Sequence, residues 1–250
     1  MKKICTLIVI CSLAFHVRSQ DVNYLLAEGA QLEKEMKDAE ALKKYQEALQ
    51  LSPTDIKALA KASELNAIIG NRLTDKKSRQ EYFDAATTFA QTALKVNDQD
   101  VEANYVMALA LSRSSVNSGV KERMDAIKDI RKYLDKSLAA DSLYFKSLHL
   151  LGKWNADVTG YSVPEKAALK VAFGGLPSTS YASAIELMEK CRRKNPNYLI
   201  NYLDLAKAYK ANGQSDKAIE ILNRLVKLPP KTADDSGYKA EGKKLLESLL

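Results

Sequence analysis

Hydrophobic residues recur every three or four positions along most of the chain, with lysine, glutamate and other polar residues between them. This spacing is typical of amphipathic helices that bury one face. Alternating β-branched residues, which would predict strands, are scarce after the first twenty positions. The pattern therefore predicts an all-α protein.

The clearest pair of predicted helices spans residues 199–230. Small side chains at Ala206 and Ala218 would let two antiparallel helices approach closely, while larger apolar residues fill the space between them. Gly213 suits the turn between the helices, and Pro230 suits the end of the second one. These residue types at these spacings resemble the 34-residue tetratricopeptide repeat (TPR), a helix-turn-helix unit.

The same template fits four more times towards the N-terminus. The five predicted units cover residues 22–55, 56–100, 101–144, 145–198 and 199–230, and a capping helix is predicted over 232–250. The residues that mark successive repeat ends lie 45, 44, 54 and 34 positions apart, so the three middle units are elongated; they are Pro53, Asp98, Ser142, Pro196 and Pro230. We expect the extra residues to lie between the two helices of each unit. The whole predicts a right-handed, TPR-like helical solenoid of about five helix pairs.

The largest addition, residues 157–178, carries helix signals of its own. Pro164 and Glu165 suit the start of a helix, and Gly174 and Gly175 suit its end. The sequence thus predicts a short extra helix inside the fourth unit. Insertions in repeat proteins usually lie on one face and can mark the functional edge.

The first nineteen residues have a different pattern. Two lysines precede an apolar run over residues 4–15, and Val17 and Ser19 suit a cleavage site before Gln20. A membrane anchor is the alternative, but the run is shorter than the roughly 20 residues that a spanning helix needs. Residues 1–19 are therefore predicted to be a signal peptide, with no transmembrane segment left after cleavage. The predicted location is the periplasm or the exterior of a Gram-negative bacterium.

Cleavage would also change the charge and the cysteine count. It removes three basic residues and no acidic ones, so the net charge falls from +7 to +4. A basic excess this small, without a concentrated stripe, predicts no nucleic-acid partner. Cys191 would be the only cysteine left, which rules out an internal disulfide bond in the mature chain.

The stretch HLLGKWNADVTGY, residues 149–161, collects side chains that could bind a metal or move protons. His149, however, would be the only histidine after cleavage, so a histidine-rich zinc site is impossible. A phosphate-loop-like run at 237–244 has Lys244 where magnesium binding needs Ser or Thr. We therefore predict a non-enzymatic protein with no cofactor and no metal. Lys153 and Asp157, four residues apart, are expected to pair on one helix face.

The concave surface of the solenoid is the predicted binding site, built mainly by the first helix of each unit. Its candidate residues are Tyr105, Arg113, Lys146, His149, Lys153, Lys207 and Lys210. Such a basic groove with aromatic edges favours a protein or acidic peptide, with an anionic lipid as a further candidate. The leading function is a scaffold that binds a protein or peptide in this groove. The alternative is a lipid-binding or lipid-transfer module that uses the groove and the 157–178 insertion.

From His149 onward the chain resembles the regulator of microtubule dynamics family. The resemblance rests on LGKWN, VPEKAALKVAFGGLPSTSYASAIELMEK, NPNYLINYLDLAKAYKANG and LPPKTADDSGYKAEGKKLLESL. It implies an all-helical, non-enzymatic repeat domain that binds other macromolecules, and animal members associate with microtubules or organelle membranes. Export from a bacterium would imply a partner other than microtubules.

Overall fold

The computed structural model describes residues 21–250 apart from 118 and 176. The predicted signal peptide, residues 1–19, lies outside this part of the chain and stays a prediction. All regular elements in the described residues are helices, and no strand occurs among them. The predicted all-α class is confirmed.

The helices follow one another with short connections. Residues 21–34 form the first described helix. It is followed by α2 (Asp38–Leu51), α3 (Ile56–Arg72), α4 (Lys76–Val96), α5 (Val101–Ser114), a short 3-10 helix η1 (Ser115–Asn117), α6 (Val120–Ala140), α7 (Phe145–Thr159), α8 (Val163–Phe173), α9 (Tyr181–Lys194), α10 (Leu199–Ala211), α11 (Ser215–Leu225) and α12 (Asp235–Glu247).

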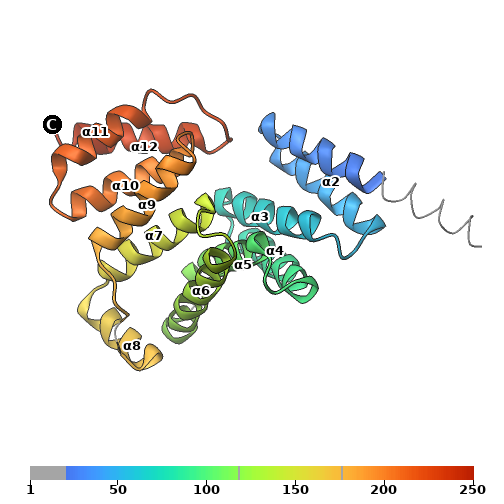
Figure 1. Ribbon diagram of the computed structural model, residues 1–250, viewed down its shortest axis with the longest axis horizontal. Helices are drawn as coiled ribbons and strands as arrows, with labels where there is room; N and C mark the ends of the chain where they lie inside the picture. Colours follow the sequence, from blue (N-terminus) through green and yellow to red (C-terminus); the bar gives the residue numbers. More distant parts are fainter. Residues whose placement is uncertain (1–20, 118, 176) are drawn as a thin grey trace, which may run out of the picture.

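Most of these helices pack in pairs that follow each other in the chain, except that α8 is inserted between α7 and α9. Helix α3 packs against α4, α5 against α6, α7 against α9 and α10 against α11, while α12 covers both α10 and α11. Figure 1 shows the pairs arranged along an arc whose two ends approach each other. Each pair also contacts the next, which makes the arrangement a helical solenoid, as predicted.

The extra residues of the second and third units lengthen helices α4 and α6 instead of forming loops between helices. Only residues 73–75 separate α3 from α4, and α4 and α6 are each 21 residues long. The expectation that the additions fall between the helices is therefore wrong for the second unit and largely wrong for the third. The reason is that apolar residues continue at helical spacing, as at Phe83, Ala86 and Ala90, with no proline or glycine to end the helix.

The fourth unit does contain an inserted helix, α8, between α7 and α9. Ser162 and Glu165 form a capping box at its start, and Gly174 ends it in the left-handed conformation with φ 69°. This confirms the predicted short helix. Leu169 is completely buried, and the helix packs against α6.

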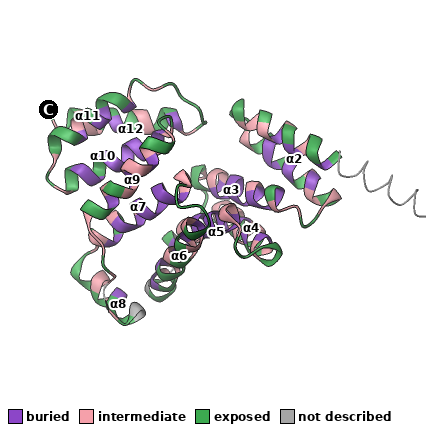
Figure 2. Ribbon diagram, viewed as in Figure 1, coloured by how far each residue is buried: buried purple, intermediate pink, exposed green. Residues whose placement is uncertain are grey.

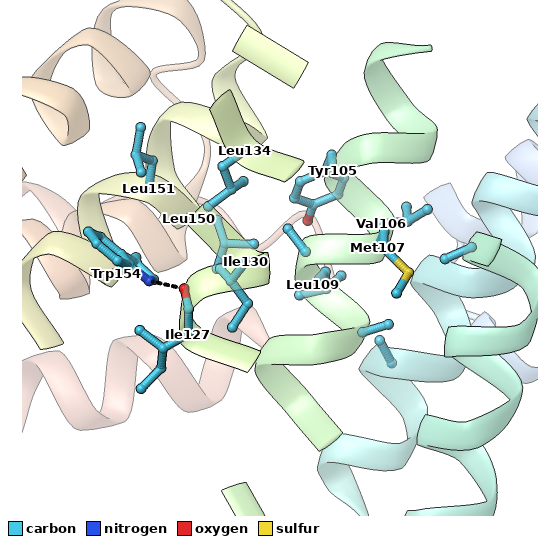
Figure 3. Close-up of a cluster of buried hydrophobic side chains, with 14 of the residues drawn as sticks. Tyr105, Val106, Met107, Leu109, Ile127, Ile130, Leu134, Leu150, Leu151 and Trp154 are labelled. Atoms are coloured by element: carbon cyan, nitrogen blue, oxygen red, sulfur yellow. Dashed lines mark hydrogen bonds between the residues drawn. The ribbon is translucent and has the colours of Figure 1, made fainter. Parts of the chain in front are cut away.

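The largest hydrophobic cluster lies in the middle of the chain, between α5, α6 and α7. Figure 2 shows buried residues concentrated on the helix faces that meet one another. Trp154 packs in this cluster and its indole Nε1 donates a hydrogen bond of 2.9 Å to the backbone oxygen of Ile127, drawn in Figure 3. The tryptophan of the HLLGKWNADVTGY stretch is thus a core residue that joins α7 to α6.

Candidate functional site: a mixed-charge cavity inside the arc

The inner side of the arc encloses a cavity of about 480 Å³. Its walls come from the first helix of successive units, namely α3, α5, α7 and α10, together with residues 33–34, the start of α2 and the segment 231–241. Helices α4, α6, α9 and α11 contribute no described residue to the lining. The curvature of the stack therefore turns one face of every second helix towards a common space.

Six of the seven predicted site residues line this cavity. They are Tyr105, Arg113, Lys146, His149, Lys153 and Lys207. The seventh, Lys210, is exposed one turn further along α10 and is not part of the lining. Lys210 therefore lies beyond the edge of the cavity, and its assignment to the groove wall is corrected.

The cavity is balanced in charge rather than basic. Seven cationic side chains line it, and so do seven acidic ones that the sequence prediction missed. The acidic residues are Glu33, Asp38, Glu64, Asp204, Asp234, Asp235 and Glu241. The expected basic groove is thus corrected, because carboxylates on neighbouring helices offset most of its positive charge.

Glu64 is the centre of one charge cluster on the cavity wall. Its carboxylate, on α3, accepts a hydrogen bond of 2.7 Å from Lys146 of α7, and Lys61 lies 3.7 Å away. Lys61 also donates a bond of 2.9 Å to Glu33. Burial alone would raise the pKa of Glu64, but the two ammonium groups outweigh it and hold that pKa below its ordinary value. The cluster ties the first, second and fourth units together.

His149 and Asp204 form a second buried pair, on α7 and α10. Nε2 of the histidine and a carboxylate oxygen of Asp204 are 2.9 Å apart, and the imidazole meets the Tyr198 ring edge to face at 5.3 Å. Burial favours a raised pKa for Asp204, but the bond to His149 and the charge of Lys153 lower it overall. His149 is therefore fixed between helices rather than free in solvent.

Arg72 joins the two ends of the arc at the cavity wall, which also includes Asp38 and Asp234. From the last turn of α3, its guanidinium donates bonds of 2.6 and 3.0 Å to Asp234 and one of 2.6 Å to Asp38. Asp234 lies 162 positions further along the chain and immediately precedes α12. This bridge, called here the Arg72 clasp, closes the arc on itself.

The side chains suspected of chemistry are paired or buried. Lys153 binds Asp157 at 2.9 Å along α7, as predicted. Burial raises the pKa of the Cys191 thiol to about 12, so the reactive thiolate is scarce near neutral pH. Within residues 21–250, excluding 118 and 176, no three His, Cys, Asp or Glu side chains lie close enough together to hold a metal ion.

Two features bear on the lipid-binding alternative. Helix α8 of the 157–178 insertion packs on α6, and none of the insertion's described residues lines the cavity, so the structure does not bring the insertion and this cavity together. Among the helices that the structure describes, none combines the length and the apolar character required to cross a membrane.

Comparison with known proteins gives a family match over nearly all of the described chain. A family model described as "Regulator of microtubule dynamics protein 1-3" matches residues 25–250. Regulator of microtubule dynamics protein 1 of Caenorhabditis elegans is 26% identical over 127 residues, or 51% of this chain and 56% of that protein. The mouse protein of the same name is 25% identical over 192 residues, or 76% of this chain and 62% of that protein. The chain therefore spans about 60% of the length of these relatives.

Solved structures with the same architecture are more distant in sequence. A TPR protein of Thermus thermophilus aligns with a TM-score of 0.63 at 15% identity, covering 89% of this chain and 99% of that one. PilF of Pseudomonas aeruginosa aligns with a TM-score of 0.53 at 14% identity, covering 93% of both chains. These similarities confirm the TPR-like fold.

Proposed function

This chain belongs to the regulator of microtubule dynamics family, and from this premise we propose that it is an interaction scaffold that binds a protein or peptide in its cavity without catalysing a reaction. The observation that carries the proposal is the cavity itself. At about 480 Å³ it lies in the size range of binding pockets, and the inner faces of four repeat helices line it.

The chemistry of the lining suits a peptide. Leu109, Leu150 and Leu203 are apolar residues of the lining, which also contains the ion pairs Lys146–Glu64 and Lys207–Glu241. A peptide presents apolar side chains and polar backbone groups together, which such a mixed surface can accommodate. A wall of paired charges suits a lipid tail less well, because burying the charges against hydrocarbon is costly.

The partner is proposed from this chemistry and not from the family name. The matched part spans 56% to 62% of the relatives reported above, so their activities as whole proteins do not transfer with it. The pattern of residues 1–19 supports export to a bacterial periplasm or beyond as part of the proposal.

Filling the cavity tests the function. Peptides selected from a random display library on the purified protein would be titrated against Ser112→Trp, which places an indole in the lining. We expect their affinity to fall at least about tenfold, or 1.4 kcal/mol. The matched control is Thr88→Trp on the exposed outer face of α4, where the affinity should stay unchanged.

Two results would contradict the proposal. Equal binding of the selected peptides to both tryptophan variants would place the binding surface outside the cavity. Stoichiometric lipid in organic extracts of the native protein, detected by mass spectrometry and absent from Ser112→Trp, would favour the lipid-binding alternative.

A further inference from the structure

Arg113 is a cation of the cavity wall that has no partner. It lies in the last turn of α5, its side chain lines the cavity, and its Nε is buried without a hydrogen-bond acceptor. The guanidinium forms no ion pair or hydrogen bond with any residue of the part that the structure describes. Buried polar groups in proteins are nearly always paired, so an unpaired guanidinium at a cavity wall is unusual.

The other cations of the wall are accounted for. Lys146 is paired with Glu64, Lys153 with Asp157, Lys207 with Glu241 and Arg72 with Asp234. The remaining two, Lys34 and Lys231, are exposed to solvent. Among the described lining residues, Arg113 therefore supplies the one partly buried positive charge that no carboxylate offsets.

Three tyrosine hydroxyls accompany Arg113. Tyr105, Tyr198 and Tyr238 line the same cavity, and none of their hydroxyls bonds to a described residue. Burial raises the pKa of each phenol, for Tyr238 to about 12, and the Arg113 charge is near enough to lower all three slightly. The phenols thus stay protonated at neutral pH and can act as hydrogen-bond donors in the cavity that the Arg113 side chain also lines.

We propose that Arg113, with the hydroxyls of Tyr105, Tyr198 and Tyr238, forms a subsite that binds a carboxylate of the peptide partner. This inference rests on the proposed function and names the group that the cavity recognises. A planar guanidinium binds a carboxylate through two parallel hydrogen bonds, and phenol donors can complete the shell.

The charge of the wall favours a carboxylate over a phosphate. One carboxylate neutralises the single unpaired charge of Arg113. A phosphate dianion would add a second negative charge in a cavity that already holds ionised Glu64 and Asp204. Recognition by this subsite is therefore expected to be selective for a monoanion.

Three small peptides and one inorganic ion serve as probes. N-acetyl-Leu-Leu carries a free terminal carboxylate, N-acetyl-Leu-Glu-amide carries a side-chain carboxylate, and N-acetyl-Leu-Leu-amide carries neither. Inorganic phosphate is the fourth probe. The readout is the Nε–Hε resonance of Arg113 in ¹H–¹⁵N spectra of the whole protein, assigned with Arg113→Lys. The two carboxylate probes should move this resonance and the amide should not, and the larger shift identifies the carboxylate source.

Substitution supplies the second readout. Arg113→Gln removes the charge but keeps hydrogen-bonding capacity, and we expect it to weaken the carboxylate probes by at least about tenfold. Lys210→Gln is the matched control, because it removes one positive charge from the neighbouring helix α10 outside the lining. Unchanged helical circular dichroism would show that both variants fold.

The results separate this subsite from the proposed function. If the display-selected peptides bind Arg113→Gln as tightly as the native protein, the subsite is wrong while the scaffold function stands. If the carboxylate probes shift the Arg113 resonance but the selected peptides bind Ser112→Trp as tightly as the native protein, the subsite stands and the proposed scaffold function is wrong. Equal shifts with the neutral amide, or tighter binding of phosphate than of either carboxylate, would overturn the proposed chemistry.

Discussion

Glu64 and Asp204 are buried carboxylates on the inner faces of α3 and α10, and neighbouring side chains keep each of them ionised. Attraction to Lys146 and Lys61 offsets the cost of removing the Glu64 charge from water. The hydrogen bond to His149 and the charge of Lys153 do the same for Asp204. A pair of this kind contributes little net stability, but removing one partner leaves an uncompensated buried charge. The two clusters therefore hold the helices in register around the cavity.

Glu64→Gln tests how much the stability of the fold depends on the buried charge cluster around Glu64. The variant leaves Lys146 and Lys61 without their shared carboxylate, and we expect a loss of about 3 kcal/mol in the free energy of unfolding by urea titration at neutral pH. Asp157→Asn is the control, because it breaks the half-exposed pair with Lys153 and should cost less than about 1 kcal/mol. Similar losses in the two variants would refute a special role for Glu64.

The Glu64 carboxylate should also make the free energy of unfolding depend on pH. Because the pKa of Glu64 is lowered in the folded state, its contribution to stability is complete above the ordinary value of 4.5 and is lost as the pH falls through the lowered value. The stability difference between native protein and Glu64→Gln should therefore shrink as the pH falls below about 4.5. Urea titrations at several pH values check this, and a constant difference would mean that Glu64 does not titrate abnormally.

The sequence predicts the cations of the cavity better than their partners. Lys146 and His149 could be placed on the inner face because helical spacing fixes which residues share a face. Their acids could not be predicted, since Glu64 lies 82 positions before Lys146 and Asp204 lies 55 after His149. Such pairs depend on the curvature of the stack, which cannot be predicted from the helical periodicity of the sequence.

At the scale of single elements, α7 and α9 pack unusually closely at Gly152. A Cβ atom added there would lie 2.7 Å from Cγ of Met188 and 3.1 Å from the backbone oxygen of Ala184. The contact lets α9 pair with α7 although the whole insertion separates them in sequence. A glycine that would weaken an isolated helix is thus required by the packing of the pair.

Gly152→Ala should destabilise the protein. We expect a loss of about 1–3 kcal/mol, because the added methyl group forces α7 and α9 apart. Gly237→Ala on the exposed side of α12 is the control, since nothing lies within 4 Å of its Cβ position. That change should stabilise by about 0.5–1 kcal/mol through helix propensity alone. Thermal unfolding shows whether each variant is less or more stable than the native protein. Stabilisation by both Gly152→Ala and Gly237→Ala would disprove the close contact.

Helix ends were predictable where a local signal marks them. Glu165 completes the capping box at the start of α8 and Gly174 ends that helix, both as the sequence indicated. The lengths of α4 and α6 were not predicted, because the repeat template fixes a unit's total length and not how its extra residues divide between helix and loop.

At the scale of the whole molecule, the Arg72 clasp joins units that no local contact would bring together. Arg72→Gln removes the charge that holds Asp38 and Asp234, so the arc should open. We expect a larger radius of gyration by small-angle X-ray scattering, and the native protein should expand similarly at about 1 M salt. Lys243→Gln, which removes an exposed charge within α12, is the control. An unchanged radius would show that apolar packing closes the arc without the clasp.

The clasp also bears on how fast a ligand enters. In most charged binding sites, added salt screens the attraction between partners and slows their association. Here the same ions would loosen the Arg72 clasp, whose residues line the cavity. We expect the clasp to open before a ligand enters, so that opening rather than diffusion limits association. The association rate constant should then rise with moderate salt, and Arg72→Gln should abolish that rise. Stopped-flow measurement of peptide association at several salt concentrations would thus report how readily the Arg72 clasp opens.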